Sequence, residues 1–156
     1  MIFNYFIFLA LVGLCILYSL WSSSSEAKVK QMERRNRTIN KVVEKGYKIS
    51  KRWDCNVMTI AIDTEKKAIG CVVLGLTSKL YIIEKKDIAA KPEIKISGVI
   101  PKFTTNICVV FKCRDNNFYF LRTLSIKKGF GVPEKSKTAQ TAVKQAEEIL
   151  EILKNF

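Results

Sequence analysis

Residues that could carry catalytic chemistry are few in this chain of 156 residues, which contains no histidine. Without histidine, acid–base catalysis near neutral pH requires a carboxylate, a lysine or a cysteine whose pKa is strongly shifted. The four aspartates all fall at predicted strand ends or turns, where aspartate stabilises the turn: Asp54, Asp63, Asp87 and Asp115. We therefore predict that the protein is not an enzyme.

The five cysteines do not form a recognisable site. They lack the CxxC or zinc-ligand spacing of a metal centre, and no motif for a cofactor accompanies them. Cys71, Cys108 and Cys113 lie within apolar runs and are expected to be buried, free thiols. Cys55 is the one candidate nucleophile, because basic neighbours would favour its thiolate. The sequence thus predicts no cofactor and no metal.

Lysines and one aromatic residue are the candidate binding residues. The segment Gly129-Phe130-Gly131 lies between lysines but lacks the spacing of a phosphate-binding loop. Phe130 has two possible roles. It is exposed and inserts into a lipid surface or partner groove, or it packs beneath the last helix as part of a hinge. We favour the second role. The candidate lipid or partner contacts are Lys28, Lys30, Lys66, Lys67, Lys127, Lys128, Phe130 and Lys135.

The positive charge, +13 in total, is concentrated just after the first 21 residues. Residues 22–52 hold ten Lys or Arg against three Glu, a net charge of +7. Such a segment can attract anionic lipid or nucleic acid. Because no nucleic-acid motif accompanies it, we expect no nucleic-acid partner.

Residues 2–21 carry no charged side chain and would span roughly 30 Å as a helix, the thickness of a bilayer core. A cleaved signal peptide is the alternative, but signal peptides begin with a basic region, and these residues have none before the apolar stretch. We predict a transmembrane anchor with the N-terminus outside and the C-terminal domain in the cytoplasm, because basic residues accumulate on the cytoplasmic side.

The remaining chain is predicted to form short antiparallel strands closed by one amphipathic helix. A helix is predicted before these strands, over residues 26–45, with Gly46 as its stop. This helix either packs on the domain or continues the anchor as a stalk. Apolar residues recur at helical spacing from Ala139 to Leu153, with Ser136 or Thr138 as the N-cap. Residues 118–125 are apolar on both faces, which is typical of a central or barrel strand. The predicted strands are residues 58–63, 68–74, 80–84, 93–100, 106–113 and 118–125.

Three stretches carry a family resemblance: residues 46–50, the predicted hairpin at residues 62–69, and the segment from residue 80 to residue 88 that includes a predicted strand and its end. They resemble a family of small uncharacterised bacterial proteins that combine an N-terminal membrane helix with a pleckstrin-homology-like (PH-like) domain of unknown function. The resemblance implies a bacterial, plasmid or phage origin, a PH-like barrel and a binding role. Residues 66–70 match the basic motif of lipid-binding PH domains only at Lys66 and Lys67.

The sequence therefore predicts an α+β protein with three parts. These are a transmembrane anchor (1–21), a basic juxtamembrane helix or linker (22–45) and a small antiparallel PH-like β-barrel or sheet closed by a C-terminal amphipathic helix (46–156). We expect a single-pass protein of the bacterial inner membrane that binds a protein or anionic lipid. An envelope-facing or secreted structural subunit, such as a pilin-like protein, is the alternative.

Overall fold

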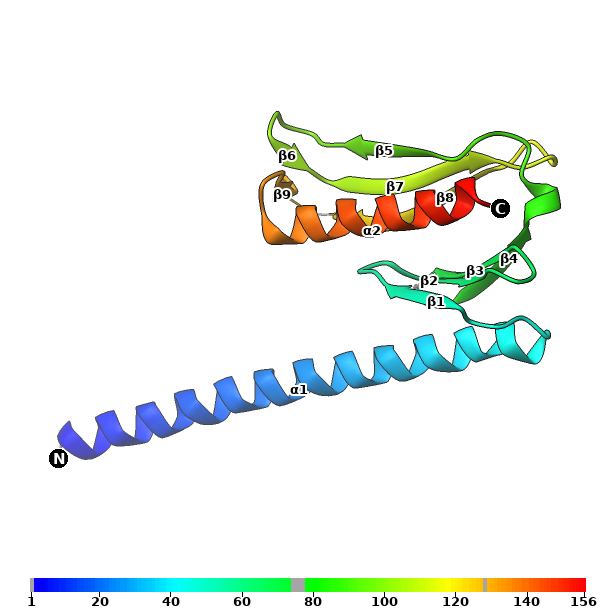
Figure 1. Ribbon diagram of the computed structural model, residues 1–156. Helices are drawn as coiled ribbons and strands as arrows, with labels where there is room; N and C mark the ends of the chain where they lie inside the picture. The colour runs from blue at the N-terminus through cyan, green and yellow to red at the C-terminus, as the bar shows by residue number, and fades with distance from the viewer. Residues whose placement is uncertain (1, 74–77, 128) are drawn as a thin grey trace. The chain divides into compact units, whose positions relative to one another are not determined.

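The computed structural model describes residues 2–73, 78–127 and 129–156, with the backbone alone for residues 2–11 and 15–24. The chain forms two compact units, Met1–Asn36 and Arg37–Phe156. Helix α1 (Ile2–Glu44) makes up the described part of the first unit and also begins the second (Figure 1). We call the second unit the head.

Within the described parts of the chain, no helix is both long enough and apolar enough to cross a membrane. The expected span, residues 2–21, lies mostly where only the backbone is described, and that backbone is helical. The span therefore stays a prediction from the sequence.

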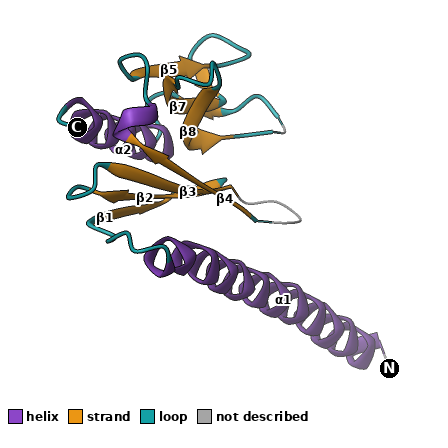
Figure 2. Cartoon of the chain, turned by 90° about the vertical axis from the view of Figure 1, so that its right-hand side faces the viewer, coloured by secondary structure: helices purple, strands orange, loops and turns teal. Residues whose placement is uncertain are grey.

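The first sheet of the head is a four-stranded antiparallel meander. Its two central strands are buried along almost their whole length, because both faces of the sheet are covered. Figure 2 shows this sheet as a layer with the last turns of α1 on one side and the rest of the head on the other. Its strands are β1 (Lys51–Asp54), β2 (Met58–Asp63), β3 (Ala68–Val73) and β4 (Lys79–Glu84).

A glycine lets the last turns of α1 lie directly against this sheet. A Cβ atom added at Gly70 would lie 2.9 Å from a methyl group of Val42, too close for two carbon atoms. Ile39 and Val42 are buried here with Ala61 and other residues of the sheet. The helix ends at Glu44, just before the predicted stop at Gly46, whose φ of +83° suits glycine.

The second sheet has the strand order β5-β7-β8, and a two-stranded sheet joins β6 to β9. A short 3₁₀ helix, η1, leads from the first sheet toward the second. Helix α2 then closes the head, and Ser136 caps it by accepting a hydrogen bond from Ala139 N at 3.3 Å. The elements are η1 (Lys85–Asp87), β5 (Glu93–Ser97), β6 (Phe103–Thr104), β7 (Asn106–Lys112), β8 (Phe118–Ser125), β9 (Val132–Pro133) and α2 (Lys137–Lys154).

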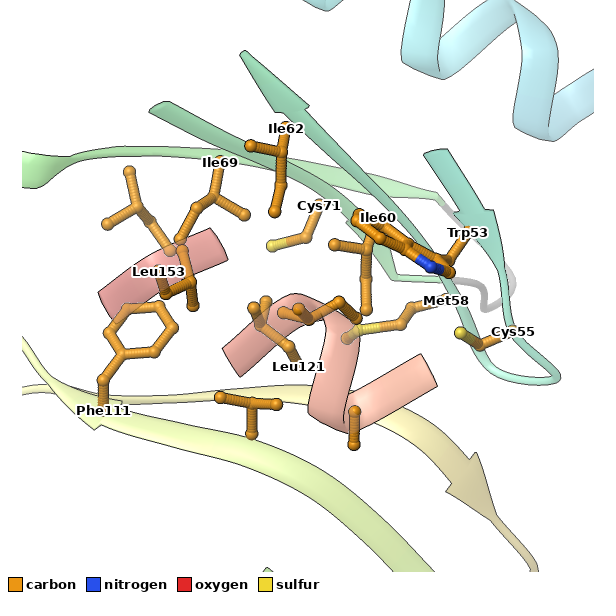
Figure 3. Close-up of a cluster of buried hydrophobic side chains, with 14 of the residues drawn as sticks. Trp53, Cys55, Met58, Ile60, Ile62, Ile69, Cys71, Phe111, Leu121 and Leu153 are labelled. Carbon is orange, nitrogen blue, oxygen red and sulfur yellow. The ribbon is translucent and has the colours of Figure 1, made fainter. Parts of the chain in front are cut away.

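The main core lies between the two larger sheets and is completed by α2 (Figure 3). Ile60 and Ile69 of the first sheet face Phe111 and Leu121 of the second, with Leu153 of α2 among them. At one border of the core, Trp53 on β1 donates a hydrogen bond to Glu148 on α2 at 3.1 Å. The α+β class and the closing C-terminal helix are thus confirmed.

Of the predicted antiparallel β-barrel or sheet, the sheet alternative is confirmed and the barrel is wrong, because neither of the larger sheets closes within the described residues. Among the residues that the structure describes, β4 pairs only with β3 and β8 only with β7, so both are edge strands there. The physical reason is that α2 packs against both sheets and supplies the closure that further strand pairing would provide. The expectation of a central or barrel strand at residues 118–125 is therefore also wrong.

Six of the strands form where the sequence predicts them, to within a few residues. The largest difference is β5, predicted to reach residue 100 but ending at Ser97, before Gly98. The sequence analysis missed β1, β6 and β9, each four residues long or shorter. Such short strands carry too few residues for an alternating pattern to emerge.

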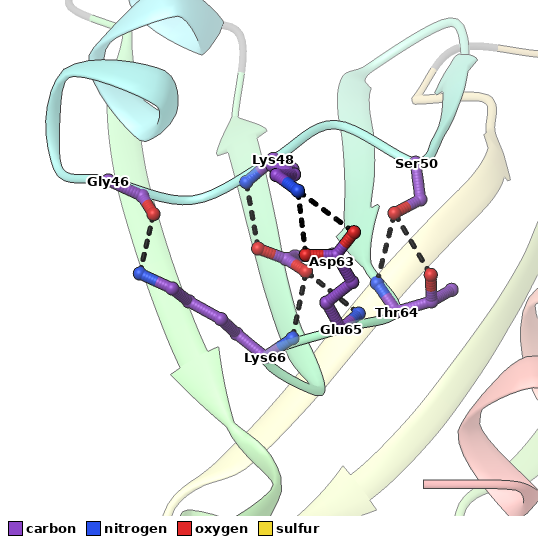
Figure 4. Close-up of polar contacts among 7 residues, drawn as sticks. All are labelled: Gly46, Lys48, Ser50, Asp63, Thr64, Glu65 and Lys66. Atoms are coloured by element: carbon purple, nitrogen blue, oxygen red, sulfur yellow. Dashed lines mark hydrogen bonds and ion pairs between the residues drawn. The ribbon is translucent and has the colours of Figure 1, made fainter.

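Asp63 organises the turn between β2 and β3 (Figure 4). One carboxylate oxygen accepts hydrogen bonds from the backbone N–H groups of Glu65 and Lys66, both at 2.9 Å. The other oxygen accepts from the backbone N–H of Lys48 at 2.7 Å, which ties the end of α1 to this hairpin. Burial acts to raise the pKa of Asp63, but the three donors outweigh it and hold that pKa below its ordinary value.

We predict that Asp63→Asn lowers the free energy of unfolding by about 2–3 kcal/mol at neutral pH, because an amide cannot accept all three bonds. Since the pKa is lower in the folded state, this stabilisation is present above the ordinary aspartate pKa. It is lost as the pH falls through the folded-state value. Thermal melts at several pH values should therefore show a weaker acid dependence in the variant.

Glu65→Gln is the matched control, because it removes only an exposed ion pair with Lys48 at 2.8 Å. It should change the free energy of unfolding by less than about 1 kcal/mol. Equal melting temperatures for the wild type and Asp63→Asn would contradict the role given to this carboxylate.

Candidate functional site

Two loops far apart in the sequence lead into the same short pair of strands in the head. Residues 98–102 connect β5 to β6, and residues 126–131 connect β8 to β9. Their strands pair, with Thr104 opposite Val132. The backbone N–H of Glu134 also donates to the carbonyl oxygen of Lys102 at 3.0 Å. The two loops therefore border the same short β6–β9 ladder, on the surface of the head.

This surface exposes large apolar side chains. Val99 is 77% exposed, Phe130 is 68% exposed and Ile100 is 39% exposed. We call these three residues the apolar tip. Exposed apolar side chains concentrated on neighbouring loops mark a place where a soluble domain contacts a partner or a membrane.

Lysines accompany the apolar tip in the same segments. Lys102 lies in the first loop, Lys127 in the second, and Lys135 and Lys137 follow β9, all exposed. Among the described residues, none of the four forms an ion pair with a carboxylate. Their charge is therefore available to an anionic surface.

A glycine in each loop allows the backbone to approach a neighbouring carbonyl oxygen closely. A side chain at Gly98 would collide with the carbonyl oxygen of Phe103. Gly131 has a φ of +95°, and a Cβ atom there would lie 2.5 Å from the carbonyl oxygen of Thr104. Each loop can therefore take this conformation without strain only with glycine at this point.

The structure places three of the predicted contact residues at this surface. Lys127 and Lys135 are exposed beside Phe130, whereas Lys128 lies outside the described residues. The favoured interpretation, that Phe130 packs beneath the last helix, is wrong. Phe130 is 68% exposed, because α2 buries its own apolar face against the sheets and leaves no room for the ring beneath it.

Lys66 and Lys67 lie elsewhere and contact the chain itself. The Lys66 ammonium donates to the carbonyl oxygen of Gly46 at 2.5 Å and lies 5.1 Å from the centre of the Tyr47 ring. Lys67 donates to the backbone oxygen of Phe156 at 2.7 Å, beyond the end of α2. The 18 residues of α2 separate this point from the apolar tip by about 26 Å. The structure therefore does not join the two groups of predicted contacts.

Lys28 and Lys30 belong to the first unit, where both are exposed on α1. They are available to an anionic surface near that unit. Their use as lipid contacts stays a prediction.

Sequence reasoning missed Val99, Ile100 and Lys102. The signal was present, because Gly98 and Pro101 mark a turn around two large apolar residues. We assigned those residues to a strand because they continue an apolar run. Because Val99 and Ile100 lie between Gly98 and Pro101, the turn residues were the better guide to their position.

The candidate catalytic residues occupy structural positions. All cysteines with described side chains beyond residue 24 are free and buried. Burial raises the pKa of the Cys71 thiol to about 12, and the Cys55 thiol lies 3.7 Å from the Gln145 side-chain oxygen. Across the described residues, no group of three or more Cys, Asp or Glu is arranged to hold a metal ion.

Comparison with profiles of known protein families, with curated proteins and with solved structures gives no match to this chain. The site must therefore be interpreted from its own chemistry. That chemistry is an apolar tip with exposed lysines in the same segments. It suits docking to a surface that presents both negative charge and apolar groups.

Gly131→Ala should disrupt this surface, because Ala at this φ is strained and its Cβ would contact Thr104 O. We expect a loss of about 2–4 kcal/mol in the free energy of unfolding. Gly129→Ala is the matched control: its φ of +81° is similar, but nothing lies within 4 Å of the added Cβ. It should cost about 1–2 kcal/mol. Equal losses in denaturant unfolding would show that the contact with Thr104 is unimportant.

Proposed function

We propose that this protein is a single-pass, non-enzymatic binding module anchored in a bacterial inner membrane. Residues 2–21 form the anchor, the head lies in the cytoplasm, and the apolar tip docks on anionic lipid. The observation that carries this proposal is the exposure of Val99 and Phe130 on neighbouring loops, with lysines beside them.

The sequence and the backbone of residues 2–21 support an anchor. A bilayer requires every backbone polar group to be paired within the chain, as in a helix. The backbone is helical over Ile2–Glu44, and residues 2–21 have no charge. The net charge of +7 that follows, over residues 22–52, favours a cytoplasmic head by the positive-inside rule.

The expected strength of lipid contact fits an anchored head. A lysine near an anionic leaflet contributes about 1 kcal/mol, so four contribute at most about 4 kcal/mol, which corresponds to millimolar affinity. A free domain would bind little at that affinity. A tethered domain experiences a high local concentration of lipid, so weak contacts suffice to orient it.

Topology separates this proposal from the pilin-like alternative. A fluorescent protein fused after Phe156 should fluoresce in the cytoplasm, and an exported phosphatase at the same point should be inactive, because the head stays inside. The opposite pattern would discard the proposed orientation and favour an envelope-facing subunit.

Vesicle sedimentation tests the lipid contact. The head alone, residues 37–156, should bind anionic vesicles weakly at low salt, bind neutral vesicles hardly at all, and lose binding at physiological salt as charge is screened. Phe130→Ser should weaken anionic binding by up to about tenfold, because an inserted ring contributes by burial.

Phe118→Ser is the matched control, since Phe118 is 57% exposed but belongs to β8, outside the apolar tip. It should leave vesicle binding unchanged. Equal binding to neutral and anionic vesicles, or equal losses in the two variants, would rule out the lipid version of the proposal.

A further inference from the structure

One edge of β8 is unpaired in the second sheet. Among the described residues, β8 pairs with β7 on one side and with no strand on the other. An unpaired edge presents a row of backbone N–H and C=O groups that can bind another strand.

The hairpin register identifies these groups. The backbone N–H of Cys113 donates to Asn117 O at 2.9 Å, so this pair is hydrogen-bonded across the hairpin. Bonded and non-bonded pairs alternate in an antiparallel ladder. The N–H and C=O groups of Phe118, Phe120 and Arg122 therefore point away from β7. Arg122 shows this directly, because its N–H lies 3.2 Å from the sulfur of Met58 in the first sheet.

A groove with a volume of about 390 Å³ lies along this edge. Residues 117–122 of the β8 hairpin form one wall, and side chains at one end of the first sheet form the other. Those side chains are mostly apolar: Met58, Cys71, Val73 and Tyr81. An inserted strand would meet backbone donors on one side and apolar surface on the other.

The edge of β8 differs from the other edges of the two larger sheets. Edge strands normally carry charged residues that prevent pairing with other chains. β1 has Lys51 and Arg52, β4 has Lys79 and Glu84, and β5 has Glu93 and Lys95. The exposed side chains of β8 are instead aromatic, with Phe118 57% exposed and Phe120 41% exposed. β8 is therefore the edge that lacks this protection.

Two cations lie beside the aromatic residues. The Lys112 ammonium lies 5.9 Å from the centre of the Phe118 ring, and the Arg122 guanidinium lies 5.7 Å from that of Phe120. An added strand would place alternate side chains beside these cations, on the outer face, and the others in the groove. Carboxylates suit the first set and apolar side chains the second.

We propose that the free edge of β8 binds an extended segment of a partner protein as an added strand, with acidic and apolar residues alternating in that segment. Backbone hydrogen bonds to Phe118 and Phe120 would provide the binding, and the groove and the cations would select the sequence. This site is separate from the apolar tip and does not depend on its lipid contact.

A display library of random octapeptides, selected against the full chain in a non-ionic detergent, tests the proposal. We expect an enriched pattern in which acidic and apolar residues alternate. The affinity of an enriched peptide should fall by roughly tenfold or more for Arg122→Glu, because the attraction between Arg122 and the peptide's carboxylates becomes a repulsion. The affinity should be unchanged for Phe130→Ala at the apolar tip.

A backbone variant distinguishes strand addition from side-chain contact. Phe120→Pro removes an N–H that points away from β7, so the existing ladder keeps its bonds, and proline is tolerated on such edges. Phe120→Ala removes the same ring but keeps the N–H. We expect a loss of roughly tenfold or more for Phe120→Pro and a clearly smaller loss for Phe120→Ala.

Amide exchange in the wild-type chain provides a measurement that needs no variant. The enriched peptide should slow exchange at Phe118 and Phe120, while Tyr119 and Leu121, already paired with β7, should change little. The proposal is overturned by a selection that enriches no peptide, by binding that Arg122→Glu leaves intact, or by unchanged exchange at the two outward amides. A dimer joined through β8 would likewise overturn it, because a second copy would then fill the edge.

Discussion

The head depends on the packing of α2 against both larger sheets, because neither sheet covers its own apolar face. Small residues let the helix approach closely, because Ala139, Ala142 and Ala146 are all buried. From the other side, Ile60 and Ile69 of the first sheet and Phe111 of the second reach the same core (Figure 3). In a closed barrel, further strands would cover these apolar faces. Here α2 covers them instead.

This arrangement explains where the binding surfaces lie. Because α2 completes the core, the strands β4 and β8 need not pair, and no described strand pairs with the edge of β8 that borders a groove. At the end of the head where α2 begins, the β6–β9 pairing is only two residues long and supports two loops. Both surfaces are thus consequences of closing a two-sheet core with a helix.

Much of this fold could be predicted from the sequence, because local patterns determine its long elements. The apolar spacing of α2, its Ser136 cap and the Asp115-Asn116 turn of the β7–β8 hairpin all act over a few residues. The exposure of Phe130 and the open edge of β8 could not be predicted in this way. Each depends on which surface α2 covers, a long-range choice that strand patterns do not encode. Apolar residues on both faces of β8 indicated burial, whereas Phe118 and Phe120 are exposed.

The contact between Gly70 and Val42 limits how this protein can change during evolution. The methyl group of Val42 occupies the space where a side chain at position 70 would begin. A larger residue at position 70 therefore requires a smaller one at position 42, or a helix that moves away from β3. The two positions, one on α1 and one on β3, are bound to evolve as a pair, although 27 residues separate them in the chain.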